Sequence, residues 1–529
     1  MDLQLRIDVP TILCDHCEFG FEHVSYNMHS ILNALRCNYS PEGAIVDEII
    51  LAVVAVDSHL DRYDPQITRF QRILDTLRAA KEDLQRFQRY CHSVVSPVRK
   101  LPPEILRQIF LECAGSEPDV IPVAGMVCRY WRDVVEASPT LWSNISVGRT
   151  RFTFHRKYLN LASLFLERSA NQPIHLTIRN PVDSRLLEAV SRHSERWSIL
   201  RIPYAEKAFY DNLALDARVL PKLVKFELFE QPGEDPRSVD RIRMFHNSPN
   251  LRQVVLIKEP KDWDLPWPQL TRLQYDTSST ADAVEILRLC PNLEDCAFDK
   301  LKSATRIRNE TRRALQHPLR KLRSLRLAID TVNPTQSAQE IMRAFFTTLN
   351  TPSLTSLAVI GQWDSADFID FLGRNQCKLR HLSLGPGYMK QDNLLDLLQI
   401  VPSLTSFVLD ADIGTTQQIS NRVLKDELLR RLVFYPESDC VLPCLTYLSL
   451  KTSVNFDDQH LLDVVESRWV PWVTELYGVR VARLTDVDLA FCGRVSKLQA
   501  STIETLKEMV EAGLRITLQQ GIETVSLIS

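Results

Sequence analysis

The residues near the N-terminus that could bind a metal are two cysteines and several later ligands. Cys14 and Cys17 are separated by two residues, a spacing that can hold half of a tetrahedral zinc site. His23, His29 and Cys37 follow at spacings that fit no common zinc module. We therefore expect an ordinary N-terminal tail with two thiols and no bound metal.

A second group with chemical potential is the run of basic residues from 306 to 326, which contains one acid, Glu310. Arginine side chains match the geometry of phosphate and carboxylate groups, so this run could receive an acidic or phosphorylated target. A solvated helix is the simpler interpretation. Two tryptophans within 262–267 could also anchor a partner, although such side chains more often close a hydrophobic layer. The candidate target-binding residues are Arg306, Arg308, Arg312, Arg313, Lys321, Arg323, Trp263 and Trp267.

The motifs of common enzyme sites are missing from the sequence. It contains no G-x-G-x-x-G, G-x-x-x-x-G-K-[ST], G-x-S-x-G or H-E-x-x-H, and only 15 of its 529 residues are glycine. Phosphate cradles and nucleophile elbows need glycine for close backbone approach. The missing motifs argue against the common enzyme classes without eliminating every one, and an enzyme built on an unrecognised site stays an alternative. We expect no cofactor, and we identify no catalytic residue in the sequence.

Composition points to an intracellular globular protein. A net charge of −3 with 45% hydrophobic residues argues against a nucleic-acid or anionic-membrane partner. Twelve cysteines without a disulfide spacing indicate reduced, mostly buried thiols, so we expect a cytoplasmic or nuclear location. The first residues lack the basic and apolar regions of a secretory signal, and the apolar run 49–56 is too short to span a membrane.

Residues 44–96 are predicted to be helical. From Val53 onward, apolar residues recur at alternating spacings of three and four, with polar breaks at Lys81 and Gln88. Because Pro65 is costly inside a helix, we expect two helices or one sharply kinked helix. This seam could form a coiled coil with a second copy or pack within the chain, and its interruptions favour packing within the chain.

The clearest pattern spans residues 101–142. A helix with proline in its first turn and apolar residues at helical spacing is followed by a Gly- and Pro-containing loop at 114–122. A second helix is expected over 123–135, and Ser138 and Pro139 end it. The residues that make up the pattern are Leu101, Pro102, Glu104, Ile105, Leu106, Ile109, Phe110, Val127, Cys128, Trp131, Pro139, Leu141 and Trp142.

This pattern resembles the F-box, from which only the stretch 114–122 departs, where the family motif is rich in leucine. The resemblance implies a small all-α domain over 97–150 that binds a Skp-type adaptor and, through it, a cullin scaffold. It also implies that the chain itself makes and breaks no bonds. The residues expected to meet or support the adaptor are Leu101, Pro102, Ile105, Leu106, Ile109, Phe110, Val127, Cys128 and Trp131.

Residues 151–529 repeat a Pro-x-Leu-x-x-apolar-x-apolar unit, with successive units 19 to 41 residues apart. Such a unit places alternate side chains of a short strand on one face, and helical segments precede several units. We expect an irregular leucine-rich-repeat-like α/β solenoid with a curved parallel sheet. The clearest strands are predicted near 223–228, 251–256, 354–359, 404–409 and 445–450, and helices are predicted at 283–290, 341–349, 368–372 and 394–401.

Shorter phrases around Arg168, Arg196 and Arg468 are similar to the large F-box families of fungi. The sequence thus predicts four parts: a tail over 1–43, a helical pair or kinked coiled-coil-like segment over 44–96, an F-box-like domain over 97–150 and a leucine-rich-repeat-like domain over 151–529. The resemblances imply a substrate-recognition adaptor of a Skp–cullin–F-box ubiquitin ligase with an unknown target protein. The alternative is a repeat scaffold that binds a partner without a ligase role.

Overall fold

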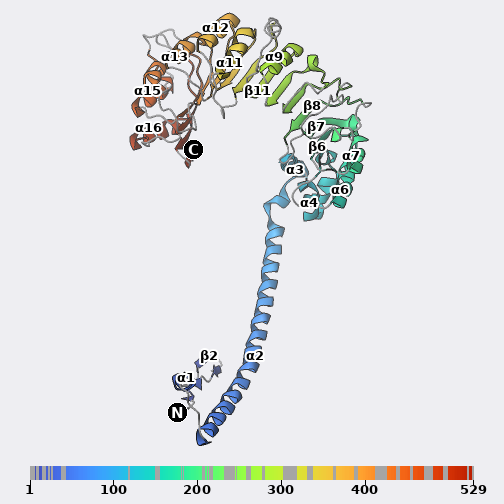
Figure 1. Ribbon diagram of the computed structural model, residues 1–529, viewed down its shortest axis with the longest axis vertical. Helices are drawn as coiled ribbons and strands as arrows, with labels where there is room; N and C mark the ends of the chain where they lie inside the picture. Colours follow the sequence, from blue (N-terminus) through green and yellow to red (C-terminus); the bar gives the residue numbers. More distant parts are fainter. Residues whose placement is uncertain are drawn as a thin grey trace. The chain divides into compact units, whose positions relative to one another are not determined.

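The chain, described here by a computed structural model, divides into two units, Met1–Pro102 and Pro103–Ser529 (Figure 1). The structure describes residues 6–7, 11–14, 19–21, 24–25, 28–36, 43–116, 119–148, 155–179, 182, 184–204, 209–210, 213, 219–230, 245, 247–257, 264–276, 280–301, 318–329, 337–361, 365–385, 391–410, 426–435, 441–452, 457–469, 481–491, 498–520 and 523–526. In this part of the chain, no helix is long and apolar enough to cross a membrane.

The first unit begins with two short antiparallel pairs. Strand β1 (Arg6–Ile7) pairs with β4 (Val24–Ser25), and β2 (Thr11–Cys14) pairs with β3 (Phe19–Phe21). Helix α1 (Met28–Arg36) follows, with His29 exposed. The question of a metal at Cys14 and Cys17 lies outside the described residues, because neither thiol is among the side chains that the structure describes.

Helix α2 (Gly43–Val95) is one continuous helix of 53 residues, so the expected pair of helices is wrong. Pro65 lies inside it, and Figure 1 shows gentle curvature rather than a sharp kink. Proline removes a single N–H donor, whereas cooperative hydrogen bonding continues over many turns on either side. In the next turn the Thr68 hydroxyl donates to the Asp64 carbonyl over 2.8 Å, a bond that commonly accompanies helix bending.

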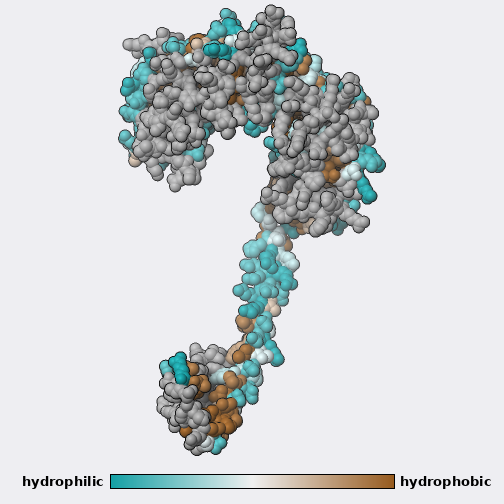
Figure 2. All heavy atoms as spheres, viewed as in Figure 1, coloured by the Kyte–Doolittle hydropathy of each residue, from teal (hydrophilic) through white to brown (hydrophobic). Residues whose placement is uncertain are grey.

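The heptad seam of α2 is exposed. From Ile67 to Leu84 its apolar side chains are 41% to 70% exposed. Hydrophobic residues gather at the N-terminal end of the helix, and hydrophilic residues cover much of the remainder (Figure 2). The sequence favoured packing of this seam against other parts of the chain. Between Ile67 and Leu84 the seam is exposed instead, so that expectation is wrong for this stretch. Pairing with a second copy stays a prediction.

The second unit is built on a fifteen-stranded sheet in which fourteen strands run parallel in sequence order, as expected for a repeat solenoid. The last strand, β19, returns antiparallel to β18. The strands are β5 (Asn144–Val147), β6 (Ile174–Ile178), β7 (Trp197–Pro203), β8 (Lys225–Phe229), β9 (Gln253–Ile257), β10 (Arg272–Asp276), β11 (Asp295–Leu301), β12 (Ser324–Ile329), β13 (Ser356–Ile360), β14 (His381–Leu384), β15 (Ser406–Asp410), β16 (Tyr447–Thr452), β17 (Asp486–Phe491), β18 (Arg515–Gln520) and β19 (Glu523–Ser526).

Helices connect these strands and cover the outer side of the curved sheet (Figure 1). The four helices predicted from the sequence are present as α9, α11, α12 and α13. The helices of this region are α6 (His155–Arg168), α7 (Ser184–Ser191), α9 (Thr280–Leu289), α11 (Ser337–Thr348), α12 (Ser365–Asn375), α13 (Gln391–Ile400), α14 (Asp426–Leu432), α15 (Asp458–Trp469) and α16 (Ala500–Glu511), with 3₁₀ turns η3 (Ser194–Arg196) and η5 (Trp267–Gln269).

Each of the five clearest strands begins two residues after its predicted start, for instance at Lys225 rather than Leu223. The first leucine of the unit lies in a tight turn, where the Leu223 N–H donates to the Leu220 carbonyl over 3.2 Å. Leu251 and Leu354 make the same bond to residues three positions earlier. These leucines are fully buried, so the repeat pattern marks a turn followed by a strand.

The core lies between the sheet and the helices. Alternate side chains of the strands are buried in β8 and β9: Phe226 and Leu228 in β8, and Val254 and Leu256 in β9. Phenylalanines connect neighbouring repeats: the Phe298 and Phe345 ring centroids are 6.0 Å apart, and the Phe346 and Phe368 centroids are 5.0 Å apart. All four are fully buried, so the core continues from repeat to repeat.

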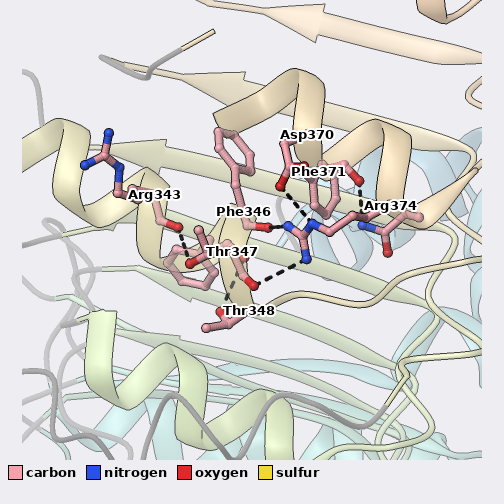
Figure 3. Close-up of polar contacts among 9 residues, drawn as sticks. Arg343, Phe346, Thr347, Thr348, Asp370, Phe371 and Arg374 are labelled. Atoms are coloured by element: carbon pink, nitrogen blue, oxygen red, sulfur yellow. Dashed lines mark hydrogen bonds and ion pairs between the residues drawn. The ribbon is translucent and has the colours of Figure 1, made fainter. Parts of the chain in front are cut away.

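Arginines tie successive helices together at their C-terminal ends. Figure 3 shows Arg374 of α12, which donates to the Phe346 and Thr347 carbonyls in the last turn of α11 and pairs with Asp370. These carbonyls have no partner within their own helix. Arg468 of α15 does the same for α14, donating to the Leu432 carbonyl over 2.7 Å and to the Leu442 carbonyl over 2.9 Å.

Arg196 has an equivalent place after α6. Its guanidinium donates to the Ser169 hydroxyl over 2.7 Å and to the Gln172 carbonyl, and burial lowers its pKa. The phrases around Arg196 and Arg468, which suggested the fungal families, therefore contain arginines that satisfy buried acceptors. Both side chains are almost fully buried.

The seven cysteines whose side chains the structure describes are unpaired. Cys290 and Cys296 are buried, and burial raises the pKa of the Cys290 thiol to about 12. Cys91, Cys113 and Cys444 are exposed, which corrects the expectation of mostly buried thiols.

Candidate docking site

The helices that precede the sheet form a small packed bundle. Within the second unit it consists of α3 (Pro103–Ser116), α4 (Val120–Val127), α5 (Arg129–Glu136) and 3₁₀ turn η2 (Pro139–Trp142). The 3₁₀ turn η1 (Pro97–Lys100) belongs to the first unit. Helix α3 contacts α4, α5 and η2. The sequence predicted a single helix over 123–135, but extended backbone at Cys128 divides it into α4 and α5.

The stretch 114–122 is more helical than the sequence suggested. Residues 114–116 complete α3, and 120–122 begin α4. Pro122 is tolerated there because the first N–H groups of a helix have no partner within the helix. Ile121 is fully buried and Ala124 is 5% exposed, so α4 packs through a short apolar stripe. The departure from the family motif therefore leaves the helical packing in place.

Aromatic residues form the centre of the bundle. The Phe110 and Trp131 rings meet edge to face with centroids 5.0 Å apart. The Trp142 indole N–H donates to the Val135 carbonyl over 2.8 Å, and Leu106 is 1% exposed. Leu106 and Phe110 were expected at the docking surface, and their burial corrects that expectation. They face the bundle interior, where they hold α3 against the other helices.

Exposed apolar side chains on α3 and α4 are the candidate docking residues. Ile105 is 49% exposed and Ile109 is 42% exposed, one helical turn apart on α3. On α4, Val127 is 58% exposed, and Val123 and Met126 are more exposed still. Sequence reasoning missed Val123 and Met126, although Val123 precedes Met126 by three residues and Val127 by four, the spacings of one helix face.

The remaining predicted docking residues are less exposed or lie in the first unit. Cys128 and Trp131 are half-buried between the helices. Leu101 is half-buried and Pro102 is exposed, and the Leu101 N–H closes η1 on the Val98 carbonyl over 3.3 Å.

The bundle is joined to the first strands of the sheet. The Asn144 side-chain amide donates to the Ala114 carbonyl at the end of α3 over 2.8 Å. The Arg168 guanidinium lies 4.7 Å from the centre of the Trp142 ring and pairs with Glu136 over 3.1 Å. Strand β5 lies within the 97–150 range expected for a separate helical module, so the bundle and the sheet share this strand.

A comparison with protein families matches residues 98–147 to the F-box-like family. The chain contains an F-box-like domain. The F-box-like match covers α3, α4, α5 and η2 and ends at the last residue of β5. A search of curated proteins finds no match to the chain, and its membership of the fungal families stays a prediction.

The structure describes only some of the predicted target-binding residues. Lys321 and Arg323 are exposed just before β12, and Trp267 is half-buried in η5. The structure brings none of these three together in a described site. The others, Arg306, Arg308, Arg312, Arg313 and Trp263, lie outside the described residues.

Replacing both Leu101 and Pro102 with alanine should weaken binding of a Skp-type adaptor by about tenfold to a hundredfold. Each substitution removes part of an apolar contact, and burying a leucine-sized side chain contributes about 1.5–3 kcal/mol. The melting temperature should be unchanged, because Pro102 is exposed and Leu101 is only half-buried. Adaptor affinity by surface plasmon resonance, with a thermal melt beside it, checks both parts. Wild-type affinity in the double variant would show that this pair lies outside the interface.

Proposed function

We propose that this protein is the substrate-recognition subunit of a Skp–cullin–F-box ubiquitin ligase, acting in the cytoplasm or nucleus. The single observation that carries the proposal is the exposed apolar surface of α3 and α4 within the range matched to the F-box-like family. Ile105 and Ile109 contribute to it from α3, and Val127 contributes from α4. Exposed apolar side chains on adjoining helices are suited to a protein partner.

The repeat domain supplies a large second surface for a target. Its strands place one row of side chains after another on the face opposite the helices, as in other solenoids that bind proteins. The ligase role is then one of proximity. A target held on the sheet, on the same chain as the adaptor site, experiences a raised effective concentration of the ubiquitin-carrying enzyme. The chain itself would contribute no bond-making residue.

Purification with a co-expressed Skp-type adaptor tests the proposal. The expected result is a stoichiometric complex that survives gel filtration and that joins a cullin subunit when the cullin is added. Failure of the adaptor to bind the folded full-length chain would overturn the ligase role and favour the alternative, a repeat scaffold without one. The alternative was suggested by the altered stretch 114–122. Because most of this stretch is helical, that argument for the alternative is weaker.

A further inference from the structure

The heptad seam of α2 runs along one face of a single helix. Because α2 continues past Pro65, the seam residues on either side of this proline stay in one register. Pro65 stands two residues after Tyr63, at the heptad position opposite the seam, so it does not interrupt the apolar face. The seam consists of Val53, Val56, Leu60, Tyr63, Ile67, Phe70, Leu74, Leu77, Lys81, Leu84, Gln88 and Cys91.

The middle of the seam is both apolar and exposed. Four successive seam residues, Ile67, Phe70, Leu74 and Leu77, have between 41% and 62% of their surface exposed. Ile73, at the edge of the seam beside them, is 46% exposed. A continuous row of large apolar side chains on one helix face is a surface suited to burial against another helix.

Lys81 in the seam determines how a second copy of α2 can lie against the first. In a parallel pair in register, each seam residue faces its own copy, so two Lys81 ammonium groups would meet inside the interface. Bringing two like charges together away from water is costly. In an antiparallel pair centred on Arg72, a seam residue faces the one equally far on the other side of Arg72. Lys81 then faces Tyr63, whose aromatic ring attracts a cation.

The antiparallel arrangement also gives the interface an apolar centre. Phe70 of one copy faces Leu74 of the other, and Ile67 faces Leu77. Each of these pairs occurs twice, because the two copies are related by a two-fold axis. Ile73 meets Ile73 of the second copy at the edge of the seam. The exposed apolar side chains in the middle of the seam are therefore all covered by apolar partners.

Charges beside the seam are complementary in the same arrangement. Asp64 and Arg78 each follow a seam residue directly, so they lie on one flank of the seam. Antiparallel pairing places Asp64 of each copy beside Arg78 of the other, and charge pairs at these flanking positions set the orientation of paired helices. Within its own helix Arg78 lies 3.7 Å from Asp75, but these side chains are 67% and 74% exposed, and such a surface pair contributes little.

We propose that α2 forms an antiparallel homodimer through this seam, with a second copy of the chain as its partner. The C-terminal end of each α2, at Val95, leads toward the F-box-like domain in the sequence. In the antiparallel pair these two ends lie about 70 Å apart, at 1.5 Å of rise per residue. The inference does not depend on the proposed ligase role, because it uses only residues of α2.

Analytical ultracentrifugation of the full-length chain tests the pairing. The wild type should sediment as a dimer. Leu74→Asp should weaken the dimer at least about a hundredfold, because it places a charge in both central layers opposite Phe70. Ala79→Asp is the matched control, since it introduces the same charge on the exposed opposite face of the same helix and should leave the dimer intact.

Two charge reversals test the orientation without altering the apolar layers. Asp64→Arg and Arg78→Asp should each weaken the dimer about tenfold or more when studied alone, because like charges then face each other twice. An equal mixture of the two variants should dimerise about as tightly as the wild type, since each arginine of one variant faces an aspartate of the other.

Four results would overturn the proposal: a monomeric wild type, a Leu74→Asp variant that dimerises like the wild type, an equal loss in Ala79→Asp, or a mixture of the charge reversals that dimerises no better than either variant alone. The last result would exclude the antiparallel orientation even if a dimer forms. If Leu74→Asp loses helical structure, the charge reversals decide, because they leave the apolar residues of the seam in place.

Discussion

Replacing Ile105 and Ile109 with aspartate should weaken adaptor binding at least about a hundredfold, because two apolar contacts are lost and two charges would have to be buried. Both side chains are more than two-fifths exposed, so the free protein should keep its melting temperature within a few degrees. Adaptor affinity measured by calorimetry, beside a thermal melt of the uncomplexed chain, gives both quantities.

Two further variants make the Ile105 and Ile109 result specific. Val219→Asp introduces the same charge at an apolar side chain that is 54% exposed outside the F-box-like domain, and it should bind adaptor normally. Conservative replacement of both isoleucines with methionine should preserve most of the affinity, since the apolar surface remains. A double aspartate variant that still binds like the wild type would remove α3 from the docking surface.

Arg468→Met is expected to destabilise the repeat domain by about 3 kcal/mol or more. The substitution keeps the volume of the side chain but leaves the Leu432, Val441 and Leu442 carbonyls without their donor, and a buried unsatisfied acceptor costs about 1–3 kcal/mol. Arg468 is 2% exposed, so water cannot easily replace it. Because repeats contact mainly their neighbours, the loss should appear as local opening of α14 and α15. Hydrogen exchange of the backbone amides in these helices measures it.

Arg374→Met is the matched comparison for Arg468→Met. Arg374 donates to two carbonyls at the end of α11, but its side chain is 42% exposed and water can take its place. Its replacement should cost roughly 1 kcal/mol or less. Similar hydrogen exchange in the two variants would mean that the buried arginine contributes no more than the exposed one.

The repeat architecture could be predicted from the sequence because each unit carries the same spacing of leucine and apolar residues, which indicates a short strand buried on one face. Leu251 and Val254 recur with the same spacing in other units, and a parallel sheet is the arrangement that buries all of them. The exact strand starts could not be predicted, because a buried leucine in a tight turn looks the same in sequence as one in a strand. Pro65 led to a wrong expectation of a helix break. The cost of one proline inside the helix is outweighed by cooperative hydrogen bonding along the 53 residues of α2.

The candidate site was predicted less completely than the fold. The F-box pattern located the helices, but it did not say which apolar residues face inward. Leu106 and Ile105 are adjacent in sequence, and only the packing of α3 shows that the first is core and the second is exposed.

The register of the sheet bears on how such a protein can change over time. Gln253 pairs with Arg272, 19 residues later, and Ser406 pairs with Tyr447, 41 residues later. Both are the first residues of neighbouring parallel strands, so the strand register is the same despite the different connection lengths. Extra residues therefore leave the sheet in the connections instead of shifting the strands. A lineage can lengthen or replace one connection while every other repeat keeps its alignment. The surface of one repeat can in this way change while the other strands and the helices α3, α4 and α5 keep their places.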